Sequence, residues 1–171
     1  MPEPGAPGAS LLFLREEQLR QAQDMLFLGW RDFSGCVDSV LAARGLGRAH
    51  HRAIHFIGRQ PGLTVSELLG LLGITKQSLS RVLATLVAQG LVSQVAGRQD
   101  RRQRLLTLTD AGVALERALF ERQRERLMAA YREAGGPAVD GFRRVMRGLM
   151  GPSARSTLDG LHAPAPARVV G

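Results

Sequence analysis

Hydrophobic residues recur every three or four positions through the first quarter of the chain. Between Arg15 and Arg44 these apolar positions are Leu19, Ala22, Leu26, Trp30, Phe33, Val37, Val40 and Leu41. The spacing is typical of one face of an α-helix and predicts a long amphipathic helix, whose broad apolar stripe favours a partner surface. Glycines then break the pattern, and a second helix is predicted from Arg48 to Gln60, before Pro61.

Two short helices joined by a tight turn are predicted next. Thr64 and Glu67 are spaced as a capping box, in which each side chain bonds the backbone amide of the other residue. That helix stops at Gly73, and Thr75 can cap a second helix that ends at Gly90. The packed face of the second helix is expected to comprise Leu79, Val82, Leu83, Leu86 and Val87. Together the pair predicts a helix-turn-helix motif.

A hairpin and two more helices complete the predicted elements. The alternating segments Leu91 to Ala96 and Arg104 to Thr109 predict two strands. A helix is then expected from Thr109 to Arg132 and a last one up to Met150, on either side of a Gly-Gly-Pro break. The expected fold class is mainly α with a small β-hairpin wing. It is a winged helix-turn-helix over 45–109, flanked by dimerisation helices over 15–44 and 110–150.

Composition changes at both ends of the chain. Residues 1–14 begin with a Pro- and Gly-rich stretch and are expected to be flexible, and residues 151–171 are expected to form a disordered tail. No basic region precedes the short apolar run at 11–14, so a secretory signal is not predicted. A single cysteine forms no intramolecular disulfide, and no apolar run approaches the roughly 20 residues that span a bilayer. A cytoplasmic protein with no membrane association is therefore expected.

Positive charge is concentrated in the middle of the chain. The formal net charge is +8, and between Ser39 and Arg104 ten cations accompany only two acids, Glu67 and Asp100. A basic centre between neutral flanks indicates a module that binds a polyanion. The alternative is a solvated basic surface with no partner.

The predicted second helix of the helix-turn-helix presents polar and small side chains opposite its packed face. Arg can bond guanine, Gln can bond adenine and Ala permits close approach to a base, so the candidates for base contacts are Gln77, Arg81 and Ala84. The candidates for DNA backbone contacts are Lys76, Ser78 and Ser80. The unpaired amides that follow Thr75 also form a phosphate site at the positive end of the helix dipole.

The predicted hairpin tip, residues 97–103, carries four charges in seven residues, and Arg104 follows it. Arg101 and Arg102 are candidates for insertion into the adjacent minor groove, and Arg98 adds positive charge beside them. Asp100 would be repelled by phosphate, so we expect it to pair with an arginine and fix its position. The alternative for Thr64 to Gln89 is an ordinary helical hairpin packed in a core. The charged tip that follows counts against it, because a structural turn seldom needs so many cations.

These residues resemble the MarR family of bacterial regulators over about Arg15 to Met150. The similar features are the opening at Thr64-Val65-Ser66-Glu67-Leu68, the helix from Thr75, and Asp100-Arg101-Arg102 followed by Leu108-Thr109-Asp110-Ala111-Gly112. The resemblance implies an obligate homodimer that straddles a pseudo-palindromic operator with two wings. It also implies control by a small ligand, often from a pocket between the dimer helices and the DNA-binding lobe. The run from Gly47 to His55 is similar to the PetP-type branch of the family.

Five residues are candidates for an effector or sensor site. His51 and His55 are four residues apart on the predicted polar side of their helix, a spacing that suits a metal or an anionic ligand, although surface or phosphate-facing histidines are the alternative. Cys36 is a candidate redox sensor, with a packed and inert thiol as the alternative. Trp30 and Phe33 can line an aromatic pocket or belong to a core. No metal or cofactor is predicted.

The sequence therefore predicts a homodimeric, sequence-specific transcriptional regulator that binds double-stranded DNA, either a repressor or an activator, modulated by a small ligand or a redox signal. The alternative is a non-specific nucleic-acid-binding protein, either architectural or associated with RNA. An enzyme is not predicted, because the chain contains no Walker loop, no G-x-S-x-G elbow and no H-E-x-x-H motif.

Overall fold

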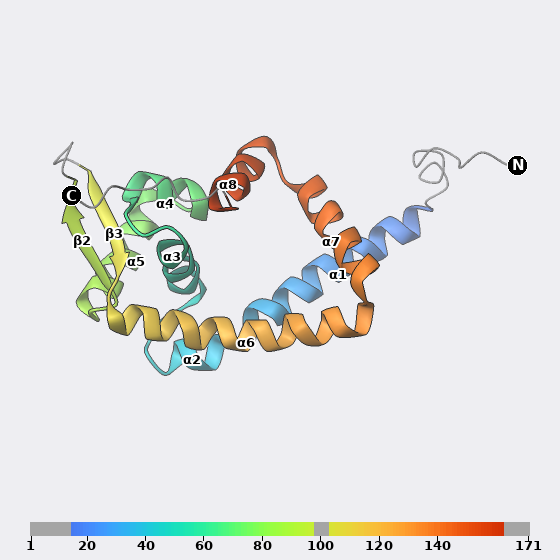
Figure 1. The fold of residues 1–171 in the computed structure, drawn as a ribbon, viewed down its shortest axis with the longest axis horizontal. Helices are drawn as coiled ribbons and strands as arrows, with labels where there is room; N and C mark the ends of the chain where they lie inside the picture. Colours follow the sequence, from blue (N-terminus) through green and yellow to red (C-terminus); the bar gives the residue numbers. More distant parts are fainter. Residues whose placement is uncertain (1–14, 98–102, 163–171) are drawn as a thin grey trace, which may run out of the picture. The chain divides into compact units, whose positions relative to one another are not determined.

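The computed structural model describes residues 15–97 and 103–162. The chain divides into two compact units, Met1–Cys36 and Val37–Gly171, which are described separately below. The first unit contributes α1 (Glu16–Gly35). The second contributes α2 (Asp38–Ala42), α3 (Arg48–Arg59), β1 (Leu63–Thr64), α4 (Val65–Leu72), α5 (Lys76–Ala88), β2 (Val92–Ala96), β3 (Arg104–Leu108), α6 (Asp110–Ala134), α7 (Gly136–Leu149) and α8 (Pro152–His162) (Figure 1).

The long helix predicted from Arg15 to Arg44 is interrupted, and in this respect the prediction is wrong. α1 ends at Gly35, and α2 begins only at Asp38. Near the break, the Ser34 hydroxyl donates to the Arg31 carbonyl and the Cys36 thiol donates to the Phe33 carbonyl. Such side-chain bonds to the preceding turn compete with continuation of the helix.

A three-stranded antiparallel sheet joins the hairpin to the start of α4. The strand order is β1-β3-β2, with Leu63 opposite Leu106 and Val92 opposite Leu108. β2 and β3 were predicted, whereas β1 was not. β1 has only two residues and immediately precedes the N-cap turn of α4, so β3 is paired by backbone hydrogen bonds to the entrance of the helix-turn-helix.

The core of the second unit surrounds α3. This helix contacts α4, α5, α6 and β3, and it lies among them in Figure 1. Ile54 and Ile57 on α3 are fully buried, as are Leu68 on α4, Leu86 on α5 and Leu106 on β3. Full burial of each such side chain stabilises the fold by roughly 1.5–3 kcal/mol. The position of α5 is therefore fixed from the inside by apolar packing.

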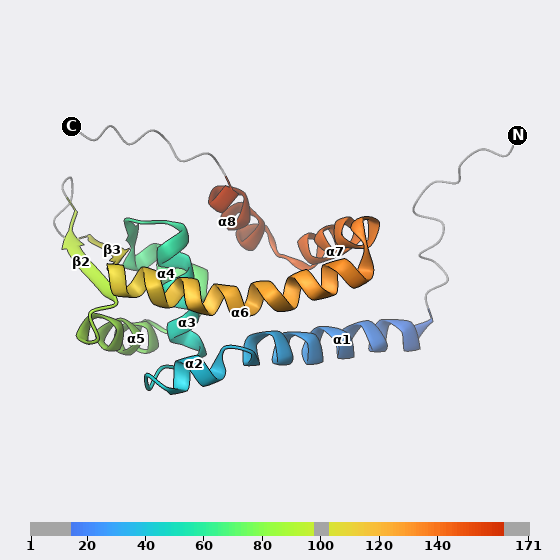
Figure 2. The ribbon, with the colours of Figure 1, turned by 60° about the horizontal axis from the view of Figure 1, so that its bottom comes forward.

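The C-terminal part of the second unit is helical and mostly exposed. α6 begins beside the sheet and extends away from it toward α7, as Figure 2 shows. Large apolar side chains are exposed along both helices: Val113, Phe120, Met128, Phe142, Val145 and Leu149. Within the described ranges, no helix is both long and apolar enough to cross a membrane.

The tail predicted to be disordered contains a helix, so that prediction is wrong for Pro152–His162. Arg147 of α7 donates two hydrogen bonds to Asp159 of α8, at 2.8 and 2.9 Å. Arg155 of α8 donates to the carbonyls of Arg147 and Gly148, each at 3.0 Å, and so satisfies the free carbonyl end of α7. These contacts between helices hold α8 in place.

Candidate nucleic-acid interface

The turn between α4 and α5 is built by side-chain caps and one glycine. The Thr64 amide donates to Glu67 Oε2 at 2.8 Å, and the Glu67 amide donates to Thr64 Oγ1 at 3.2 Å, which is the predicted capping box. α4 ends at Gly73, whose φ of 61° lies in the left-handed region that favours glycine. The Ser78 amide then donates to Thr75 Oγ1 at 3.2 Å and starts α5. The predicted helix-turn-helix is therefore present.

α5 has one buried face and one exposed face. The buried residues are Leu79, Val82, Leu83 and Leu86. The predicted contact residues on the opposite side are all exposed: Thr75, Lys76, Gln77, Ser78, Ser80, Arg81 and Ala84. Val87 was predicted to belong to the packed face, but 40% of its surface is exposed. Val87 instead lines an open groove beside the helix.

The electrostatics of α5 favour an anion. The helix contains Lys76 and Arg81 and no acidic residue, and its first turn carries no carboxylate to oppose the free amides there. A helix N-terminus attracts negative charge because its unpaired amides and the helix dipole both point toward the ligand. An exposed, uncharged or basic helix face of this kind fits the major groove of DNA.

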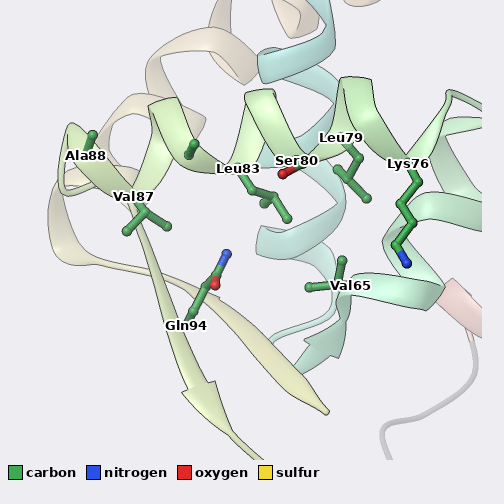
Figure 3. Close-up of a pocket in the computed structure, with 9 residues that line it drawn as sticks. Val65, Lys76, Leu79, Ser80, Leu83, Val87, Ala88 and Gln94 are labelled. Atoms are coloured by element: carbon green, nitrogen blue, oxygen red, sulfur yellow. The ribbon is translucent and has the colours of Figure 1, made fainter. Parts of the chain in front are cut away.

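A groove of about 520 Å³ runs between α5 and the hairpin (Figure 3). Its lining residues are Val65, Lys76, Leu79, Ser80, Leu83, Ala84, Val87, Ala88 and Gln94. Gln94 was not among the predicted site residues. The signal that could have identified it is its place two residues after Val92, where the alternation of β2 calls for a second apolar side chain.

The wing is described up to Gly97 and again from Gln103, and the Gly97 amide donates to the Gln103 carbonyl at 2.9 Å across the hairpin. Arg98, Asp100, Arg101 and Arg102 lie outside the described residues, so their roles stay predictions. Arg104, at the start of β3, is exposed. The base of the wing therefore carries one cation on the described part of the hairpin.

The histidines of α3 are less accessible than predicted. His51 and His55 are half-buried rather than on an open polar face, and this burial lowers the pKa of each. His50 instead accepts a hydrogen bond from the Gly47 amide at its Nδ1 atom, at 3.0 Å, and so caps the start of α3. Within residues 15–97 and 103–162, no group of three or more His, Cys, Asp or Glu residues is placed to hold a metal.

A second pocket, of about 620 Å³, opens beside His55. It lies between α3, α6 and α8 and combines apolar and charged groups: His55, Phe56, Gly58, Arg59, Glu116, Phe120, Leu158, Leu161 and His162. Arg59 donates to the Leu161 carbonyl at 3.5 Å. Burial raises the pKa of Glu116, and the positive charge of Arg59 opposes that shift.

The remaining sensor candidates lie in the first unit. The rings of Trp30 and Phe33 are 6.1 Å apart between centroids, and 60% of the Trp30 surface is exposed. Cys36 is half-buried and follows α1 rather than lying inside a continuous helix. The Sγ atom of Cys36 lies 3.0 Å from the Phe33 carbonyl oxygen. The structure therefore places these three residues close together in sequence and space at the end of α1.

A helix-turn-helix joined to a β-hairpin defines a winged-helix DNA-binding protein. A family model described as the MarR family matches residues 44–103. The HTH-type transcriptional regulator PetP of Rhodobacter capsulatus is 53% identical over 156 residues, which cover 91% of this chain and 94% of that protein. The chain belongs to the MarR family of transcriptional regulators.

Solved structures share the fold at lower identity. A MarR-family regulator from Silicibacter pomeroyi is 21% identical with a TM-score of 0.64, covering 88% of this chain and 94% of that chain. The reduced form of MarR from E. coli is 18% identical with a TM-score of 0.61, covering 75% of this chain and 96% of that chain. NadR in complex with 4-hydroxyphenylacetate is 23% identical with a TM-score of 0.61, covering 87% of this chain and 97% of that chain. The predicted fold class is confirmed.

Proposed function

We propose that the protein acts as a homodimer that binds a pseudo-palindromic operator in a sequence-specific manner and so regulates transcription, as a repressor or an activator. The observation that carries the proposal is the exposed face of α5, which presents Gln77, Arg81 and Ala84 with no acidic residue anywhere on the helix. Side chains of these types discriminate bases in the major groove. Family membership supports the regulatory role.

The contact residues divide by chemistry. Gln77, Arg81 and Ala84 read base edges, whereas Lys76, Ser78 and Ser80 and the amides after Thr75 hold phosphates. On the wing, we assign Arg101 and Arg102 to the minor groove, with Arg98 near the backbone. Asp100 pairs with one of these arginines and fixes its direction.

The dimer would form through the exposed apolar stripes of the terminal helices. In the first unit, Leu19, Leu26 and Trp30 are each more than 40% exposed along α1. In the second unit, α7 has no buried residue although it carries Phe142, Val145 and Leu149. Exposed apolar surface of this extent is typical of a protein–protein interface.

Modulation by a small ligand is supported by the pocket between α3, α6 and α8. Its lining combines aromatic rings with Arg59, a composition that suits an amphiphilic effector. NadR is described in complex with 4-hydroxyphenylacetate, an effector-sized molecule. Half-buried Cys36 is the redox alternative. We further propose a cytoplasmic location, double-stranded DNA as the partner, and no enzymatic activity.

The test is a competition experiment on the full chain. A labelled duplex carrying the protein's own promoter is titrated with protein at several salt concentrations, against unlabelled random duplex and against structured RNA. We expect a marked preference for the promoter and a steep salt dependence. Equal competition by random DNA or RNA would favour a non-specific binder instead. Light scattering at micromolar concentration should give twice the chain mass, and a monomer would contradict the dimer.

A further inference from the structure

Gln94 is a polar residue on the inner face of β2. It lies opposite Leu106 in the register of the sheet, and residues opposite each other project to the same face. Leu106 is fully buried, and Val92, two positions before Gln94 on the same face, is 2% exposed. Position 94 itself is exposed, at the point where this face of the strand opens to the surface, so the Gln94 side chain is accessible to a partner from outside the chain.

The carboxamide of Gln94 has no hydrogen-bond partner within the part of the chain that the structure describes. The same is true of the side-chain polar atoms of Lys76 and Ser80 in the same groove. Figure 3 shows the Gln94 side chain directed toward α5, with Ser80 and Lys76 further along the groove. Three polar groups on two elements thus share one open groove, and none of them is hydrogen-bonded to a residue within 15–97 or 103–162.

The chemistry of the groove is that of a site for an anion with apolar flanks. Its polar side chains can all donate hydrogen bonds, through an ammonium, a hydroxyl and an amide, and no carboxylate lines it. The walls between them are apolar, from Val65, Leu79 and Leu83. A sugar–phosphate backbone offers this combination, because charged oxygens alternate with deoxyribose carbons.

The groove is also continuous with the exposed face of α5. Lys76, Ser80, Ala84 and Ala88 are spaced by four residues and form one edge of the helix, and this edge borders the groove. Gln77 and Arg81 lie next to that edge on the exposed side. A duplex whose bases face Gln77 and Arg81 would bring one of its strands alongside the groove.

We propose that the groove between α5 and β2 seats the sugar–phosphate backbone of one DNA strand, and that Gln94 donates a hydrogen bond to a phosphate oxygen there. The proposal rests on the DNA-binding function proposed above and adds a contact from the hairpin strand. Because phosphates are the same at every base pair, the contact raises affinity for any duplex and fixes the position of α5 in the groove of DNA.

The experiment compares four variants on the promoter duplex and on a random duplex. Gln94→Ala should weaken both by a similar factor, about 10-fold, because one hydrogen bond to a charged acceptor is lost. Gln94→Glu should weaken both further by repulsion. Gln94→Lys should restore the affinity that Gln94→Ala loses. It should also steepen the slope of log affinity against log salt concentration by about one, because a cation then contacts the phosphate. The control is Ser93→Ala, on the opposite face of the same strand, which should bind as the parent does.

A second measurement identifies the contacted atom. Duplexes in which single phosphates are replaced by neutral methylphosphonates are tested with the parent and with Gln94→Ala. At one position the replacement should weaken DNA binding by the parent and leave binding by Gln94→Ala unchanged. The variant already lacks the contact that the neutral phosphate removes. Unchanged binding by Gln94→Ala, or a loss confined to one base pair of the promoter, overturns the proposal. If Arg81→Ala affects both duplexes equally while Gln94→Ala behaves as expected, the specificity assignment fails and the backbone site stands.

Discussion

Gly112 of α6 lies directly against the backbone carbonyl of Leu91, so close that a Cβ atom at position 112 would overlap the carbonyl oxygen. The same carbonyl accepts a hydrogen bond from the Thr109 amide at 3.1 Å, and the Thr109 hydroxyl donates to the Gly90 carbonyl at 2.6 Å. The start of α6 is therefore packed without space onto the turn between α5 and β2. This contact fixes the base of the hairpin relative to α5.

The first prediction concerns this close approach. Gly112→Ala should lower the free energy of unfolding by about 1–3 kcal/mol or more, because the methyl group meets backbone atoms that have little freedom to move. Urea denaturation followed by circular dichroism measures the change. The matched control is Gly70→Ala in α4, where a Cβ meets nothing within 4 Å and stability should rise by roughly 0.5–1 kcal/mol. Equal stability of the two variants would contradict the packing.

The second prediction separates base readout from backbone binding. Arg81→Ala should weaken binding to the promoter duplex by about 1–3 kcal/mol and leave the random duplex less affected, because a base contact is lost. Lys76→Ala should weaken both duplexes and reduce the slope of affinity against salt by about one. Fluorescence anisotropy at four salt concentrations gives both quantities. Arg117→Ala, an exposed arginine on α6, is the control for a general charge effect.

The third prediction concerns pH. Burial lowers the pKa of His51 and His55 below the ordinary 6.5, aided by the charge of His55 and of Arg59 respectively, while Asp38 opposes the shift at His51. Near and below pH 6.5 the unfolded chain therefore binds more protons than the folded chain, so the free energy of unfolding should fall as the pH drops below about 6.5 toward the lowered pKa values of the folded chain. Denaturation curves at a series of pH values measure this slope.

The control for the pH effect is a variant in which both histidines are replaced, His51→Gln with His55→Gln. Its stability should depend less on pH than that of the parent over the same interval. Glu116 acts in the opposite direction, since its raised pKa gives a contribution that is lost as the pH rises above 4.5. Because Glu116 is present in both proteins, the difference between their slopes reports the histidines. Identical slopes would refute the assignment.

The fourth prediction concerns the cap of α5. Thr75→Ala removes the acceptor for the Ser78 amide and should cost about 1 kcal/mol of stability. Frayed amides in the first turn would also weaken phosphate binding, so affinity for promoter and random duplexes should fall together. Thr75→Ser retains the hydroxyl oxygen and should behave nearly as the parent in both assays. A Thr75→Ser variant as weak as Thr75→Ala would indicate that the methyl group, not the cap, matters.

Local sequence signals predicted the helix-turn-helix because each of its boundaries is set by a residue close in sequence. The capping residues act on backbone groups within three or four positions, and they are Thr64 with Glu67, Gly73 and Thr75. Their spacing in the sequence is therefore sufficient to predict where the two helices begin and end. The apolar periodicity of α5 likewise predicted four buried residues correctly. It failed at Val87, which faces a groove whose other wall is a strand seven positions away, at Gln94.

Features that depend on distant residues were not predicted. β1 exists because Leu63 and Thr64 pair with β3 some forty residues later, and two residues carry no periodicity of their own. α8 is held by Arg147 of the preceding helix, whereas its own composition suggested disorder. The break between α1 and α2 follows from side-chain bonds of Ser34 and Cys36 to carbonyls, which a hydrophobic pattern does not record.

The pairing of β1 with β3 has a consequence for the cost of association. Since β3 is bonded on one side to β2 and on the other to the residues that open α4, the described base of the hairpin and the helix-turn-helix form one continuous backbone scaffold. The hairpin base and the helix-turn-helix have little freedom to rotate relative to each other. The conformational entropy of ordering them is therefore lost during folding rather than during DNA binding. The two elements would therefore engage DNA as a preorganised unit.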